Sequence, residues 1–318
     1  MAGCDRCVRS CRNGYACNVV GSTGDLVAWH VVYGSVSRAE DLSLYHLCPG
    51  KLVLRLVLPG SPITCNRLWC VEYSRPSTLA LKRITVDNVV GLVERLRPAA
   101  ILVDGCEPLV MDWPFELAEK VKNRLENPPL LIARSLGLLS LKRVEEMVGV
   151  FDALVVEYVQ SICGDEVAGY IPHINKVIEL ASIRGLLAEI HYHLTADKTS
   201  RIIAVDVAER ARRPIVMVAV DERAHSLAYK LVKDLRERGH FAHLHQDESY
   251  TLQDIVCPYC GHILVKRRPW GVNVDAREAP SGERNSAICP KCGRRIAPLY
   301  LCPSGKKPLA IHREIAVL

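Results

Sequence analysis

The sequence predicts an α/β protein: a partial TIM-type barrel of six βα units, preceded by a cysteine-rich metal-binding module and followed by a zinc ribbon. Three observations lead to this prediction. Short apolar runs alternate with amphipathic helical stretches between about residues 51 and 250. Four closely spaced cysteines lie within residues 4–17, and two Cys-Pro-x-Cys-Gly motifs lie within residues 251–318. We therefore expect three regions with these bounds.

Length and composition indicate a folded body of the size of an enzyme. The chain has 318 residues, of which 49% are hydrophobic, enough for one large core with small appendages. No apolar stretch approaches the ~20 residues that span a bilayer, and the N-terminus runs into arginine-rich sequence, so we expect a cytoplasmic protein that makes no contact with a membrane. The net charge of +6 is spread along the chain. Short runs such as Lys266-Arg267-Arg268 are a weak nucleic-acid signal that a solvated surface explains equally well.

The predicted strands share short runs of Leu, Ile and Val. They are residues 52–58, 99–104, 129–133, 153–156, 186–192 and 215–220, with 241–245 as a short last strand. The amphipathic stretches between them predict helices at residues 86–96, 114–124, 141–148, 172–183 and 224–238. Thr85 is the expected N-cap of the first helix.

Polar residues gather where the predicted strands end. In a barrel of this kind the functional site lies at the carboxyl ends of the strands. The residues at these ends are Asp104, Glu107, Arg134, Glu157 and Asp221, and Glu189, His191 and His193 share one face of the fifth strand. We expect them to converge on one pocket. The alternative is that some are ordinary hydrogen-bonded residues or loop charges.

The strongest motif is the pair of cysteine knuckles near the C-terminus. Its cysteines are Cys257, Cys260, Cys289 and Cys292. Fourteen cysteines are many for a cytosolic chain, whose thiols stay reduced, so regularly spaced ones indicate metal ligands before disulfides. Four thiolates in two Cys-x-x-Cys pairs suit tetrahedral zinc. The spacer between the pairs contains an apolar run and a Pro-Ser-Gly turn, which permits a hairpin, and Cys302 lies outside the motif.

A second cysteine group lies at the N-terminus. Its members are Cys4, Cys7, Cys11 and Cys17. This spacing predicts zinc or an iron–sulfur cluster, in a structural or electron-transfer role because four thiolates fill every coordination position. The alternative is a reduced terminus without a metal.

Several short segments, in order along the chain, resemble one family. After the N-terminal cysteines come Tyr33-Gly34-Ser35, then Leu44-Tyr45-His46-Leu47-Cys48-Pro49-Gly50, then Cys65-Asn66 and Glu107-Pro108, and finally the two C-terminal knuckles. In this order they resemble the "PLYHF-PG", "NEP" and "CP-CG" segments of the AmmeMemoRadiSam-type radical SAM proteins, relatives of the pyruvate formate-lyase activating enzymes. The resemblance runs over nearly the whole chain.

The resemblance implies a (βα)6 radical SAM barrel with a [4Fe-4S] cluster that reductively cleaves S-adenosylmethionine, often to place a radical on a partner protein. Three cysteines of a C-x3-C-x2-C motif hold such a cluster. In this sequence only Cys65 matches that motif, because Trp69 and Glu72 stand at the second and third positions and Cys70 comes one place late. Val159 also replaces a lysine of the family, and Leu194-Thr195-Ala196-Asp197 replaces its "IPG-ND" turn.

The departure leaves three functional readings. In the first, Cys65, Cys70, Cys106 and Cys163 rebuild a metal centre that His191 or His193 completes, with Gly105, Cys106 and Glu107 near S-adenosylmethionine. The second is a non-catalytic metal-binding scaffold for partner proteins, in which these cysteines are merely buried. The third, ranked last, is nucleic-acid binding through the ribbon and its basic neighbours.

Overall fold

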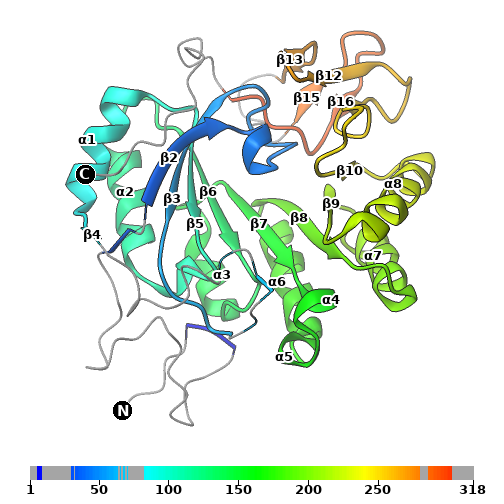
Figure 1. Cartoon of the computed structure of the whole chain (residues 1–318). Helices are drawn as coiled ribbons and strands as arrows, with labels where there is room; N and C mark the ends of the chain where they lie inside the picture. The colour runs from blue at the N-terminus through cyan, green and yellow to red at the C-terminus, as the bar shows by residue number, and fades with distance from the viewer. Residues whose placement is uncertain are drawn as a thin grey trace. The chain divides into compact units, whose positions relative to one another are not determined.

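The structure is a computed structural model that describes residues 6–8, 30–31, 33–63, 65, 67–68, 70, 82–279 and 286–302. It is a mixed α/β protein with an eight-stranded, mostly parallel sheet in the order β10-β9-β8-β7-β6-β5-β3-β2 (Figure 1). The chain forms two compact units. The first comprises the described parts of residues 1–37 and 53–188, and the second those of residues 38–52 and 189–305.

The first unit is built on four parallel strands. They are β3 (Leu52–Val57), β5 (Ala100–Asp104), β6 (Leu130–Ser135) and β7 (Ala153–Tyr158), and consecutive members pair in parallel. Every residue of β5, β6 and β7 is buried. Unbroken apolar runs of this kind form strands that are covered on both faces, as in parallel sheets with crossover helices. The unit also contains β2 (Tyr33–Arg38) and the short antiparallel pair of β1 (His30–Val31) with β4 (Lys82–Arg83).

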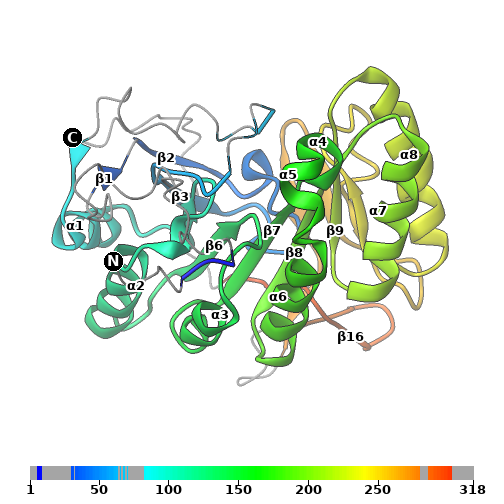
Figure 2. The same cartoon turned by 90° about the horizontal axis from the view of Figure 1, so that it is seen from below.

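Helices connect the strands of the first unit. They are α1 (Val86–Leu96), α2 (Trp113–Arg124), α3 (Leu141–Met147), α4 (Gln160–Cys163), α5 (Asp165–Ala168) and α6 (Ile171–Ile183), with the 3-10 turn η4 (Pro108–Val110) (Figure 2). The helix predicted at residues 86–96 has the observed bounds. Its N-cap is Thr85, as predicted: the Thr85 side chain accepts a hydrogen bond from the Asn88 N–H, and the Asn88 side chain bonds back to the Thr85 N–H.

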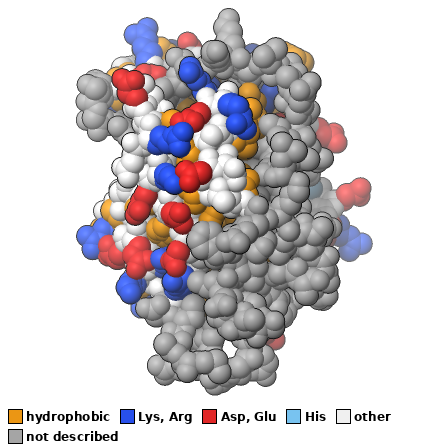
Figure 3. Space-filling view, turned by 90° about the vertical axis from the view of Figure 1, so that its left-hand side faces the viewer, with side chains coloured by type: hydrophobic (Ala, Val, Ile, Leu, Met, Phe, Trp, Pro, Cys, Tyr) orange, Lys and Arg blue, Asp and Glu red, His pale blue; other side chains and the backbone are white. Residues whose placement is uncertain are grey.

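The outer surface of α1 and α2 carries charges of both signs. Figure 3 shows Lys, Arg, Asp and Glu side chains interspersed on the described part of this face. Asp87 pairs with Lys120 at 2.8 Å, and Glu94 pairs with Arg124 at 2.8 Å. Exposed pairs of this kind add little stability but keep the face well solvated.

The second unit continues the alternation of strands and helices. Its elements are β8 (Leu187–Leu194), α7 (Lys198–Ala211), β9 (Ile215–Ala219), α8 (Glu222–Glu237) and β10 (Ala242–Leu244), with the 3-10 turn η1 (Glu40–Leu42). β9 pairs in parallel with both β8 and β10. Asp197 and Asp221 cap α7 and α8 by accepting backbone N–H groups of Ser200 and Ala224. Within the described ranges of both units, no helix combines the length and the apolar character that crossing a bilayer requires.

The C-terminal part of the second unit is a pair of small antiparallel sheets. One contains β11 (Ile255–Val256), β12 (Ile263–Arg268) and β13 (Gly271–Val274), and the other β14 (Arg277–Glu278), β15 (Ala287–Ile288) and β16 (Arg295–Ile296). The spacer between the two knuckles thus forms a hairpin of β12 with β13. The two small sheets share one hydrophobic core. It contains Cys257 and Cys289 together with Ile255, Leu264, Val265, Ala287, Ile296 and Leu299.

The sheet agrees with the predicted α/β class. Its parallel strands run from β3 to β10 in chain order, as successive βα units of a barrel do. β2 and β10 are its edges among the described residues, so the predicted partial barrel remains a prediction.

The backbone after β5 requires glycine, which gives a test of the strand-end geometry. Gly105 has φ +138°, and a Cβ atom there would lie 2.7 Å from the carbonyl oxygen of Leu58. Gly149 also has positive φ, +81°, but its Cβ would meet nothing within 4 Å. We expect Gly149→Ala to cost about 1–2 kcal/mol in free energy of unfolding and Gly105→Ala at least about 2 kcal/mol more, measured by urea denaturation. Equal losses in the two variants would contradict the close approach of Leu58.

Candidate functional site

Four cysteine sulfurs of the ribbon converge on one point. The Sγ atoms of Cys257, Cys260, Cys289 and Cys292 all lie within 4.8 Å of one another. The Cys257 and Cys292 sulfurs are 3.8 Å apart, and those of Cys260 and Cys289 are 3.7 Å apart. The sequence predicted these four as one metal site, and the structure brings all of them together. This cluster can hold a metal ion.

The two knuckles share one backbone design, which explains the Cys-Pro-x-Cys-Gly motif. Each glycine, Gly261 or Gly293, has φ near +70° and donates its N–H to the carbonyl of the first cysteine of its knuckle. Positive φ favours glycine because it has no Cβ atom. The tight turn places both sulfurs of each knuckle within 4.8 Å of the other knuckle's sulfurs.

The electrostatics of one knuckle favour a thiolate. Burial raises the pKa of Cys289, but the backbone N–H groups of Cys292 and Lys291 hydrogen-bond its sulfur and bring that pKa down to about 6. Metal ligation requires the deprotonated sulfur, which the surroundings of Cys289 favour. The pKa of Cys260 is raised instead: its backbone hydrogen bond from His262 lowers that pKa, but burial and the contacts with Cys257 and Cys289 outweigh it.

Four cysteines of the first unit form two pairs. Cys65 is bonded to Cys163, and Cys70 to Cys106, with Cα–Cα distances of 5.5 Å in both disulfides. All four are buried. The structure therefore brings the predicted cysteines together two by two, as disulfides, and this state leaves none of these four as a thiolate for iron. A third disulfide joins Cys48 to Cys302 in the second unit, although Cys302 was expected to stand apart.

Three of the predicted strand-end residues satisfy one another in a buried ion-pair network. Asp104 accepts from Arg55 at 2.6 Å and from Arg134 at 3.0 Å, and Arg134 pairs with Glu157 at 3.1 Å. The second Asp104 oxygen accepts the Gly105 N–H at 2.7 Å. Two arginines and two carboxylates balance in charge, so this network supports the structural alternative for these residues. Asp221 likewise serves as a helix cap.

Glu107 is a buried carboxyl group without a charge partner of this kind. Its Oε2 accepts the Leu138 N–H at 3.0 Å, while its Oε1 has no hydrogen-bond partner among the described residues. Burial raises the pKa of Glu107 to about 7, against hydrogen bonds from Ser135, Leu138 and Leu136. The group is therefore close to half-protonated at neutral pH.

Glu189 on β8 anchors the segment from Leu44 to Gly50. It accepts the backbone N–H of His46 at 2.9 Å and of Tyr45 at 3.4 Å, and it pairs with His191 at 3.1 Å. Burial raises the pKa of Glu189, but the hydrogen bonds from the His191 side chain and from the backbone N–H of His46 help to outweigh it, so the pKa is lowered. His193 is also buried on β8. Two of the three predicted residues on this strand thus share one interaction.

Sequence reasoning missed a buried histidine pair next to this anchor. His46 Nδ1 lies 2.5 Å from the carbonyl oxygen of Pro298, and His46 Nε2 lies 2.7 Å from His243 Nε2. Arg236 lies 3.1 Å from His243 Nδ1. Since a carbonyl only accepts and an arginine only donates, His46 is protonated at Nδ1 and His243 at Nε2, and two neutral rings satisfy every contact. Burial lowers the pKa of His46 to about 4 and that of His243 well below its usual value. Both shifts agree with two neutral rings at neutral pH.

One of the predicted surface cations is in fact buried. Arg267 is 1% exposed and donates to the carbonyl oxygens of Tyr45 and Gln253 and to the Glu40 carboxylate. The interpretation of residues 266–268 as a wholly solvated basic run is therefore wrong at its centre. The three residues are consecutive in a strand, and neighbouring side chains of a strand point to opposite faces of the sheet. Lys266 is therefore exposed while Arg267 is buried.

The N-terminal cysteine group falls largely beyond the described residues. Cys4, Cys11 and Cys17 lie outside them. Cys7 is buried and forms an antiparallel bridge with Leu139, next to the residue whose N–H binds Glu107.

The unusual pKa of Glu107 yields a test. Since its folded-state pKa is raised, its contribution to stability is fully present below pH 4.5 and is lost as the pH rises through about 7. Gln cannot ionise, so Glu107→Gln should stabilise the protein relative to wild type by up to about 3 kcal/mol at pH 8, and by about zero at pH 4.5. Urea denaturation at both pH values measures this difference. The exposed control, Glu116→Gln, should show no such pH dependence; a gain for Glu107→Gln that is the same at both pH values would refute the assignment.

Comparison of the chain with models of known protein families gave no match, and a search among characterised proteins gave no similar sequence.

Proposed function

We propose that this protein is a zinc-binding scaffold on a radical SAM-like α/β body, in which disulfides occupy the places of a catalytic cluster, and that it acts by binding a partner protein. The observation that carries the proposal is the pairing of Cys65 with Cys163 and of Cys70 with Cys106. A [4Fe-4S] cluster that binds S-adenosylmethionine needs three thiolates around an open iron, and these bonds use up the sulfurs that would supply them.

Zinc is the metal that suits the ribbon best. Zinc–sulfur bonds of about 2.3 Å in a tetrahedron place neighbouring sulfurs about 3.8 Å apart. The sulfur separations of 3.7 and 3.8 Å in the ribbon agree with that value. With four protein thiolates the coordination is complete, so the ion stabilises the ribbon and leaves no position for a substrate.

The exposed aromatic residues of the ribbon support a role in binding a partner. Trp270, at the turn between β12 and β13, is 81% exposed, and Tyr259 in the first knuckle is 56% exposed. Large aromatic side chains are enriched at protein interfaces, where they supply much of the binding energy.

A second candidate function is a rebuilt cluster in the reduced protein. Glu107 favours it: a buried carboxyl group with one oxygen unpartnered among the described residues directly follows Cys106. A buried oxygen without a hydrogen-bond partner calls for an explanation, and a catalytic role is one of the known explanations. Reduction of both disulfides would free four thiolates in this part of the first unit.

The zinc assignment predicts the metal content of two cysteine variants. Cys289→Ser should lose about one equivalent of zinc relative to wild type, because three thiolates and a hydroxyl bind zinc poorly. Cys163→Ser, the matched control, should keep its zinc. Elemental analysis after dialysis measures both. Equal zinc content in wild type and Cys289→Ser would contradict the ribbon site.

Iron analysis separates the two candidate functions. Wild type and a Cys65→Ala/Cys70→Ala variant are purified anaerobically, reduced, and supplied with iron and sulfide. The scaffold proposal predicts that any bound iron is the same in both proteins and that S-adenosylmethionine does not bind. A loss of about four irons per chain in the variant would instead establish the rebuilt cluster.

A further inference from the structure

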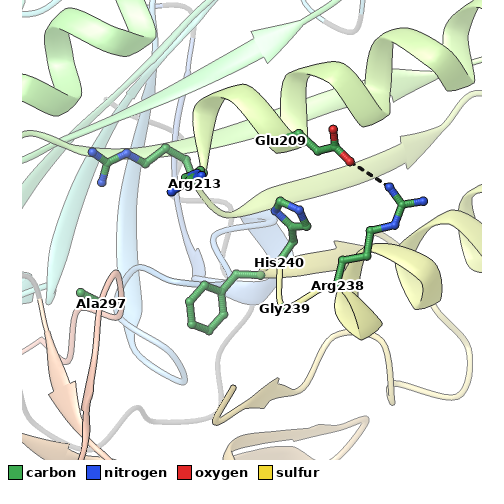
Figure 4. A pocket seen from close by; sticks show the side chains of 8 residues that line it. Glu209, Arg213, Arg238, Gly239, His240 and Ala297 are labelled. Carbon is green, nitrogen blue, oxygen red and sulfur yellow. Dashed lines mark hydrogen bonds and ion pairs between the residues drawn. The ribbon is translucent and has the colours of Figure 1, made fainter. Parts of the chain in front are cut away.

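A hollow in the second unit is lined by an unusual concentration of positive charge. Its volume is about 540 Å³, and it lies where α7 leads into β9 and α8 leads into β10. Its lining residues are Glu209, Arg212, Arg213, Arg238, Gly239, His240, Phe241 and Ala297 (Figure 4). None of these residues belongs to the ribbon's cysteine cluster or is a predicted site residue.

The arginines of this hollow differ in whether their guanidinium groups have ion-pair partners among the described residues. Arg238 pairs with Glu209 at 2.8 Å and with Asp234 at 2.7 Å. The guanidinium groups of Arg212 and Arg213 make no hydrogen bond or ion pair with the described residues. In the view of Figure 4, Arg213 lies on the other side of His240 from the Glu209–Arg238 pair. The single carboxylate of the hollow is thus engaged, and two cations remain uncompensated.

Ordinary structural reasons account for only one of the two unpaired arginines. Arg212 is the C-cap of α7 and is exposed, and a cation there is stabilised by the helix dipole. Arg213 is half-buried, and burial lowers its pKa with no opposing carboxylate among the causes. Partial burial of a charge without a partner costs free energy. An anion bound next to Arg213 would reduce that cost.

The rest of the lining indicates the size and character of the anion. Half-buried Phe241 packs edge-on against His46, with ring centroids 5.1 Å apart, and is held in place by that contact. His240 adds an imidazole ring to the lining. The Phe241 ring and the two arginines line the same hollow. This lining suits a ligand that has both a planar group and phosphates, because one guanidinium group can bind two phosphate oxygens at once. The volume lies within the range of small-ligand sites, about 300–1,000 Å³.

We propose that this hollow is a binding site for a small phosphorylated ligand of nucleotide type, with Arg212 and Arg213 binding the phosphates and Phe241 contacting the planar group. The site goes beyond the zinc-binding scaffold and does not depend on it.

Calorimetric titration of the full chain with ADP, adenosine, pyrophosphate and a short RNA tests the site. ADP should bind, and adenosine should bind at least about tenfold more weakly, because it lacks the phosphates. Arg212→Gln/Arg213→Gln should weaken ADP binding at least about tenfold, while Arg223→Gln, an exposed arginine outside the hollow, should change it less than about twofold. Matching thermal melts verify that the variants are folded.

The outcomes of this titration decide the proposal. Pyrophosphate binding as tightly as ADP would support the phosphate contacts but overturn the proposed contact of Phe241 with the planar group. Adenosine binding as tightly as ADP, ADP binding unaffected by the double variant, or no binding of any small probe would overturn the site. Retention of RNA alone, sensitive to the double variant, would also overturn it in favour of a nucleic-acid surface.

Discussion

A charged side chain that is taken out of water costs several kcal/mol unless opposite charge or hydrogen bonds replace its solvent. The strands of this protein end in charged residues that are almost wholly buried, so this cost decides which of them are structural. Asp104 and Glu157 offset this desolvation cost by forming ion pairs with Arg55 and Arg134. Glu189 meets it with backbone N–H groups of Tyr45 and His46 and with His191, and in doing so fixes the segment that carries Leu44 to Gly50. Once these groups are satisfied, they have little capacity left for a ligand.

The same cost explains the exceptions. Glu107 is deeply buried with too few donors, and it responds by holding its proton to about neutral pH. His46 and His243 respond in the opposite sense: they remain neutral and bind each other between a carbonyl oxygen and Arg236. Arg213 has neither a partner nor full solvation. Glu107 and Arg213 are therefore two places where a bound ligand or a change of protonation state would lower the free energy of the folded protein.

Much of the architecture could be predicted from the sequence, because local rules act strongly in it. The apolar runs predicted the parallel strands β3 and β5 to β9, and Thr85 predicted the start of α1. The two Cys-Pro-x-Cys-Gly motifs predicted the cysteine cluster that can hold a metal ion. Each of these signals lies within a few neighbouring residues. The pairing of Cys48 with Cys302, 254 residues apart, depends on the folded chain and has no local signal. The burial of Arg267 and the His46–His243 contact were missed for the same reason. The convergence of all the strand-end residues on one pocket stays a prediction. The sequence could not tell that Asp104, Arg134 and Glu157 would pair with one another and with Arg55.

Anomalous X-ray diffraction at the zinc and iron edges, from crystals grown anaerobically with iron and sulfide present, tests the central claim most directly. The account predicts a zinc peak among Cys257, Cys260, Cys289 and Cys292, and continuous density between the sulfurs of Cys65 and Cys163 and of Cys70 and Cys106. An iron peak bound by Cys65, Cys70 or Cys106 would contradict it and restore a catalytic cluster to this body.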